Sequence, residues 1–152
     1  MMTNSRNRSV ILAGILLVLV GTVPPATAAR SLYVHDEGRL HYTGSSGSLL
    51  REEGSAIGTL PGKLHVHFTY TGSSLAITAQ FTITGTGWSL TGRGTGRLSN
   101  PNSPSPSFRG PMSITGGTGR YVHAHGTGEL FGVFYRRKHY ALTVQTLGEL
   151  HY

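Results

Sequence analysis

The chain has 152 residues, a formal net charge of +7 and no cysteine. The length suits one domain with a single core, and the lack of cysteine excludes a disulfide framework. Its lysines and arginines are scattered apart from one triplet at 136–138, so we expect no nucleic-acid partner.

The first 28 residues have the pattern of a signal peptide. Arg6 and Arg8 precede an apolar run at 10–20, and an Ala-Thr-Ala cleavage site follows at 26–28. The run is short for a membrane span, which needs ~20 residues. We therefore predict a signal peptide helix at 1–28 and a mature domain at 29–152. An uncleaved N-terminal anchor is the alternative.

Cleavage after residue 28 would leave 124 residues and a net charge of +5, because Arg6 and Arg8 are the only charged residues removed. We expect this domain to be secreted or to stay in the periplasm or cell envelope, with no membrane contact after processing. It must be stabilised by packing and strand pairing alone, since it has no disulfide.

The first half of the mature chain alternates between strands and turns. The segment 32–42 reads as a strand with a bulge at Gly38, and a Gly/Ser turn at 43–48 follows it. Short strands are expected at 49–53 and 56–60. The next two, at 63–71 and 75–84, are joined as a hairpin by residues 72–74.

The second half continues this rhythm and shows no helical periodicity. The expected strands lie at 88–98, 108–115, 122–134 and 140–152. A proline-rich loop at 100–107 separates the first two, and prolines cannot donate to a strand ladder. The basic triplet at 136–138 occupies a solvated turn between the last two.

Apolar residues recur at every second position of these strands. Leu64, Val66, Phe68 and Tyr70 share one face of the segment 63–71, and small or apolar residues alternate in the same way at 88–98 and 126–134. We predict an all-β fold: a closed or nearly closed antiparallel barrel of about eight strands, which leaves no unpaired sheet edge.

A glycine-rich turn separates the segment 108–115 from the strand after it. Gly116, Gly117 and Gly119 suit a tight turn, where at least one of them should take positive φ. The surrounding T-G-G-T-G-R-Y, followed by A-x-G-T-G at 124–128 and a glycine-rich strand, resembles the allene oxide cyclase and dirigent type of small secreted β-barrel. The resemblance is to bacterial, mostly uncharacterised members.

The resemblance implies an eight-stranded antiparallel barrel. It also implies an activity, since such enzymes steer cyclisation or radical coupling of an apolar substrate inside the barrel. Only the glycine-rich turn matches, so no catalytic residue is carried over to this chain. Fold similarity alone does not assign an activity.

Histidine is the one residue type that suggests metal chemistry. Two pairs, His65 with His67 and His123 with His125, have the spacing that puts both rings on one strand face, and Glu129 has the same parity as the second pair. These side chains alternate with inward apolar residues, so we expect them to face outward and favour no metal site. The alternative for the strand at 121–135 is a bulge at 126–128 that reverses the parity and turns Phe131, Val133 and Tyr135 inward. No cofactor is expected.

Three functions stay open at this point. The barrel could bind a small apolar molecule or a partner without catalysis, act as a cyclase-like enzyme, or bind metal through its histidines. A filled interior would favour binding, and a roomy cavity with a buried acid would favour an enzyme. Converging imidazoles would favour metal. Homo-oligomerisation also stays open.

Overall fold

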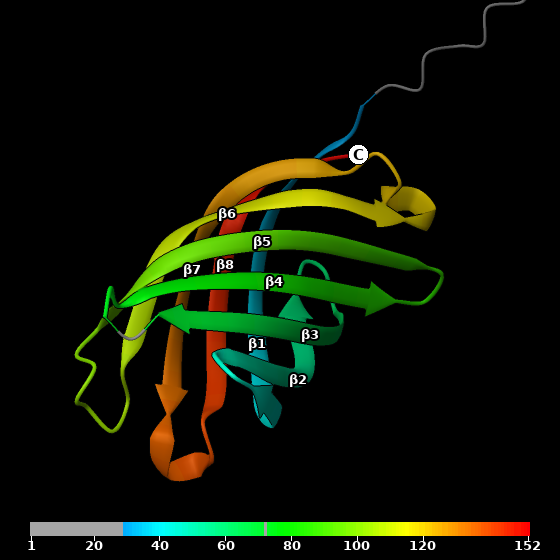
Figure 1. Ribbon diagram of the computed structural model, residues 1–152. Helices are drawn as coiled ribbons and strands as arrows, with labels where there is room; N and C mark the ends of the chain where they lie inside the picture. Colours follow the sequence, from blue (N-terminus) through cyan, green and yellow to red (C-terminus); the bar gives the residue numbers. More distant parts are fainter. Residues whose placement is uncertain (1–28, 72) are drawn as a thin grey trace, which may run out of the picture.

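The computed structural model describes residues 29–71 and 73–152, so the expected signal peptide at 1–28 lies outside the described residues. Eight antiparallel strands follow one another around a closed barrel, with β1 paired to β8 (Figure 1). The predicted fold class is confirmed. Among the described residues, no helix is both long and apolar enough to cross a membrane. The strands are β1 (Ser31–Ser46), β2 (Leu49–Gly58), β3 (Gly62–Thr71), β4 (Ala76–Gly85), β5 (Trp88–Ser99), β6 (Ser107–Thr118), β7 (His125–Tyr135) and β8 (Ala141–His151).

The first two strands are longer and more regular than the sequence predicts. The predicted bulge at Gly38 is wrong, because the β1–β2 register shifts only between Tyr42 and Gly44. A Cβ at Gly38 would lie 2.6 Å from a methyl carbon of Leu64, so this glycine makes room for a neighbour. The two short strands expected at 49–53 and 56–60 form a single strand, β2.

The strand expected at 122–134 begins only at His125. Before it, the residues Gly119–Tyr121 form a short 3-10 turn, η1, and the backbone N–H of Ala124 donates to the carbonyl of Tyr121 at 2.9 Å. The Tyr121 side chain is buried, which turns the chain away from the strand direction here. Similarly, β8 begins at Ala141 rather than Tyr140, because Tyr140 has a φ of +60°.

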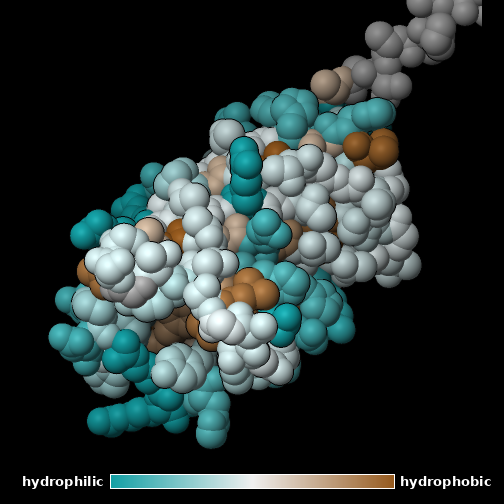
Figure 2. All heavy atoms as spheres, in the orientation of Figure 1, coloured by the Kyte–Doolittle hydropathy of each residue, from teal (hydrophilic) through white to brown (hydrophobic). Residues whose placement is uncertain are grey.

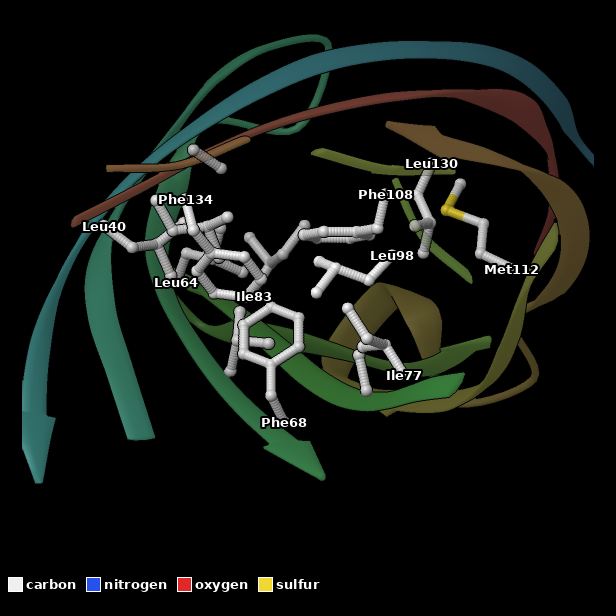
Figure 3. Packing of buried hydrophobic residues seen from close by; sticks show 14 residues of the cluster. Leu40, Leu64, Phe68, Ile77, Ile83, Leu98, Phe108, Met112, Leu130 and Phe134 are labelled. Carbon is white, nitrogen blue, oxygen red and sulfur yellow. The ribbon is translucent and has the colours of Figure 1, made fainter. Parts of the chain in front are cut away.

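Side chains fill most of the barrel interior. The inward face predicted for β3 is confirmed, since Leu64, Val66 and Phe68 are all buried. On the far wall, a Cβ at Gly132 would overlap the ring of Phe108, so glycine at this position leaves space for the ring. Figure 3 shows Phe68, Phe108 and Phe134 converging inside the barrel. The outer face seen in Figure 2 is mostly hydrophilic or neutral, with small hydrophobic patches.

One end of the barrel is closed by aromatic packing. The ring of Tyr121 lies between those of Trp88 and Tyr152, at centroid distances of 5.0 and 4.9 Å, both edge to face. The Arg120 guanidinium covers Trp88 and Tyr121 from outside. Leu60, from the turn between β2 and β3, is buried in the same cluster. The glycine-rich turn therefore serves to place Tyr121 as a seal.

Candidate functional site

The opposite end of the barrel holds an apolar cup of about 270 Å³. This is the end where β1 meets β2, β3 meets β4, β5 meets β6 and β7 meets β8, at the lower left of Figure 1. The wall of the cup is aliphatic and aromatic, with one cation at its edge. It consists of Leu50, Phe68, Tyr70, Ile77, Leu98, Pro106, Phe134, Arg136 and Tyr140.

The proline-rich loop at 100–106 is held against the end of β7 and completes one wall of the cup. The backbone N–H groups of Phe134 and Arg136 donate to the carbonyls of Pro106 and Pro104, both at 3.0 Å. The Arg136 guanidinium also donates to the carbonyl of Pro101. Proline lacks an N–H but keeps its carbonyl, so the loop takes part in pairing as an acceptor.

A smaller chamber of about 60 Å³ lies deeper in the barrel. Phe68 borders both the chamber and the cup, and its ring packs edge to face on Phe108 and Phe134 at centroid distances of 5.8 and 5.4 Å. The three rings thus form a partition. A cavity of about 150 Å³ is known to hold benzene, so the chamber alone is too small for most apolar ligands, whereas the cup is large enough.

Asp36 is a buried acid on the wall of the chamber. One carboxylate oxygen accepts a hydrogen bond from the backbone N–H of Leu60 at 2.8 Å, and the other has no partner in the described part of the chain. Burial raises the pKa of Asp36, against the opposing effect of the backbone hydrogen bonds from Leu60 and Thr59. The acid thereby ties the turn that carries Leu60 to β1.

Glu52 is a second buried acid, with only 1% of its surface exposed. Neither of its carboxylate oxygens finds a hydrogen-bond partner among the described residues. Burial raises its pKa to about 7, which leaves the carboxyl largely neutral in mild acid. Glu52 follows Leu50 on the inward face of β2, but it lines neither the cup nor the chamber.

The two acids do not form a catalytic pair. In the β1–β2 ladder Asp36 lies opposite Gly58, whereas Glu52 lies opposite Tyr42. Six residues of strand separate these positions, which is about 20 Å at ~3.3 Å per residue. Two carboxyl groups that share one proton or one water must be much closer, so each acts separately.

The structure places the predicted histidines on the outside, as expected. His67, His123 and His125 are exposed, and the Nδ1 atom of His65 lies 3.3 Å from a carboxylate oxygen of Glu53. His123 precedes β7, so the strand spacing predicted for it with His125 is wrong. Among the described residues, no group of three or more His, Cys, Asp or Glu side chains could hold a metal ion.

Glu129, the oxygen ligand considered beside His123 and His125, is engaged elsewhere. Its carboxylate is paired with the guanidinium of Arg109 across the outer face of β6 and β7. The cluster His123, His125 and Glu129 therefore does not assemble.

The glycine-rich turn predicted at Gly116, Gly117 and Gly119 is only partly right. Gly116 and Gly117 belong to β6, where they pair with Thr91 and Leu90, and the turn itself begins at Gly119. Gly119 has a φ of +61° and Gly116 one of +156°, which confirms that at least one of the three glycines takes positive φ. A Cβ on Gly117 or on Gly119 would overlap the carbonyl oxygen of Ser89 or of Gly87, respectively. Gly116 has more room, since the nearest atom to a Cβ there is 3.9 Å away.

Sequence reasoning missed Asp36, Glu52 and the cup. The alternation of strand residues could have identified the two acids. Asp36 is two residues from Val34 on an expected strand and Glu52 is two residues from Leu50, so each acid shares a face with an apolar residue. No comparable signal marks the cup, because its wall combines residues of β2, β3, β4, β5 and β7 with the loop before β6 and the turn after β7.

No protein-family model matches this chain, and a comparison with curated proteins finds no match. The resemblance to the allene oxide cyclase and dirigent type of barrel stays a prediction.

Proposed function

We propose that this protein is an exported barrel that binds a small apolar molecule in the cup formed by Leu50, Phe68, Tyr70, Ile77, Leu98, Phe134 and Tyr140. The observation that carries the proposal is the contrast between the two ends. Tyr121 seals one end, whereas the other keeps an apolar cavity of about 270 Å³. Ligand sites are typically concave and mostly apolar, with few polar groups.

The cup is built to stay open. Its floor is the partition of Phe68, Phe108 and Phe134, whose rings pack on one another without a ligand. The hydrogen bonds from β7 hold the loop 100–106 at the rim. A preformed cavity lowers the conformational cost of binding, which supports a binding function.

Export is part of the proposal and is supported by the signal-peptide pattern at 1–28. A relationship to the allene oxide cyclase and dirigent type of barrel is supported by the T-G-G-T-G-R-Y turn together with the eight-stranded fold. A cyclase-like activity would need a proton donor at the ligand. The neutral form of Glu52 has that chemistry, but its place outside the cup favours simple binding.

The experiment compares two lysine substitutions on β2. Leu50→Lys places a charge in the cup, whereas the control Ile57→Lys makes the same change at a residue of the outer surface that is 54% exposed. Binding of 1-aminoanthracene, an apolar dye that brightens away from water, is followed by fluorescence. We expect Leu50→Lys to weaken the dye affinity by at least about tenfold, or ~1.4 kcal/mol, and Ile57→Lys to leave it unchanged. Equal affinities in both folded variants would refute the cup as the site.

A further inference from the structure

Two histidines face each other across β7 and β8, at the sealed end of the barrel and away from the cup. His125 and His151 are directly opposite in the antiparallel ladder, with ring centroids 5.3 Å apart and ring planes inclined by 30°. His125 is exposed, and 37% of the His151 side chain is accessible to solvent. We propose that the Nε2 atoms of His125 and His151 bind a divalent transition-metal ion, with Cu²⁺ the preferred one.

The hydrogen bonds of the two rings support this assignment. The Nδ1 atom of His125 lies 3.2 Å from the carbonyl oxygen of His123. A carbonyl can only accept, so this Nδ1 carries the proton and the lone pair is left on Nε2. Metal-binding histidines commonly donate their other N–H to a backbone carbonyl in this way.

His151 has the matching arrangement. Its Nδ1 atom lies 3.0 Å from the hydroxyl oxygen of Ser31, and this hydroxyl can either accept the N–H of the ring or donate to its lone pair. When Nδ1 is the donor, the lone pair of His151 is on Nε2, as in His125. In that tautomer both rings present a free Nε2 to an ion, each with its other nitrogen held by a hydrogen bond.

The spacing and the local charge suit a cation. Directly opposed residues have Cβ atoms about 4.5–5.5 Å apart, and a metal–imidazole bond is ~2.0–2.1 Å, so small side-chain rotations bring both nitrogens onto one ion. The carboxylate of Glu149 lies 3.9 Å from Nε2 of His151 and adds negative charge beside the site. Solvent would fill the remaining coordination positions.

A site with two imidazole ligands favours Cu²⁺, because affinity for nitrogen donors peaks at copper among the divalent first-row metals. The proposal differs from the sequence-based one in its partner for His125. His123 precedes β7 and does not share a strand face with His125, whereas His151 lies directly opposite His125 in the ladder. Metal binding should therefore depend on His151 and not on the side chain of His123.

The test is a titration of the purified, metal-free protein, prepared without a histidine tag, with Cu²⁺ at neutral pH. Electron paramagnetic resonance reports how many nitrogens bind the ion. The variants are His125→Ala, His151→Ala and His123→Ala, and a double variant His65→Ala, His67→Ala serves as the matched control on β3. Far-UV circular dichroism without metal checks that each variant is folded.

We expect one bound Cu²⁺ with two nitrogen ligands in the wild type. His125→Ala and His151→Ala should each weaken binding more than about tenfold, and Ser31→Ala should weaken it less. His123→Ala and the control on β3 should bind like the wild type. The proposal is overturned if the wild type binds no Cu²⁺, if His151→Ala keeps the affinity, or if His123→Ala loses as much as His125→Ala.

Discussion

The carboxylate of Asp36 accepts a hydrogen bond from the backbone N–H of Leu60 at 2.8 Å, and this bond joins the barrel wall to the turn that closes it. Asp36 is 4% exposed and Leu60 is buried, so the N–H has no access to water as a substitute partner. A buried N–H without an acceptor costs ~1–3 kcal/mol.

Asp36→Ala should therefore be less stable than Asp36→Asn by ~1–3 kcal/mol, because only the amide keeps an oxygen for the N–H of Leu60. Urea unfolding at pH 8 measures the difference. Asparagine also removes the buried charge, so Asp36→Asn should remain close to the wild type. Equal stability of the two variants would mean that the bond to Leu60 does not secure the closed end.

Glu52 should make the stability of the protein depend on pH. Burial raises its pKa from 4.5 to about 7, so the native state keeps a proton that the unfolded state has lost. The contribution of Glu52 to the free energy of unfolding is full below pH 4.5. It falls as the pH rises through about 7 and is absent above that. Between these two pH values the free energy of unfolding should fall by about 3 kcal/mol because of Glu52, at ~1.4 kcal/mol for each pKa unit.

Glu52→Gln should flatten this pH dependence, and urea unfolding between pH 4.5 and pH 8 would show it. A smaller slope of the same sign should remain, since burial also raises the pKa of Asp36. The control is Glu53→Gln, at the adjacent position, whose carboxylate lies beside His65 and Lys63 on the outer face. Parallel stability curves for the wild type and Glu52→Gln would contradict the proposed burial effect.

Gly119→Val should destabilise the barrel by ~1–3 kcal/mol, the usual cost of a residue forced into a sparsely populated backbone region. Gly119 has a φ of +61°, and a Cβ there would also overlap the carbonyl oxygen of Gly87. The control is Gly44→Val, because a Cβ on Gly44 meets no atom within 4 Å. Thermal unfolding that is unchanged by Gly119→Val would remove the structural role of the turn.

Arg136→Ala should loosen the loop 100–106 with little loss of global stability. The variant removes the side-chain bond to Pro101 but keeps the backbone bond to Pro104. Amide hydrogen exchange in the loop should become faster, while the free energy of unfolding changes by about 1 kcal/mol or less. Arg137→Ala, a change in the next residue of the same turn, should leave loop exchange unaltered. Identical exchange rates in both variants would argue that the Arg136 guanidinium does not hold the loop in place.

The alternation along the chain predicts the barrel because a residue's parity decides which face of a strand it occupies. On β3 the inward residues Leu64, Val66 and Phe68 follow this rule without interruption, and β3 pairs with β2 over 62–69 and with β4 over 63–71 without a register shift. The same rule, applied to Asp36 and Glu52, places both acids inside. Polar residues on an inward face are easily overlooked when the pattern is read only from apolar side chains.

The features that the alternation does not predict depend on contacts between distant parts of the chain. The turn Gly119–Tyr121 interrupts the expected strand because Tyr121 packs on Trp88 and Tyr152, which are far from it in sequence. The facing of His125 and His151 likewise follows from the register of β7 with β8. Neither relationship follows from the spacing of residues along the chain. The alternation therefore predicts the strands but not which of their residues lie side by side.

The central claim, that a small apolar molecule binds in the cup, is tested most directly by methyl NMR during a titration with benzene. We expect saturable shifts for the methyl groups of Leu50, Ile77 and Leu98, which line the cup, and no shift for Ile57 on the outer surface. Shifts confined to Ile57 and other outward methyl groups, or no saturable shift in any methyl group, would contradict it.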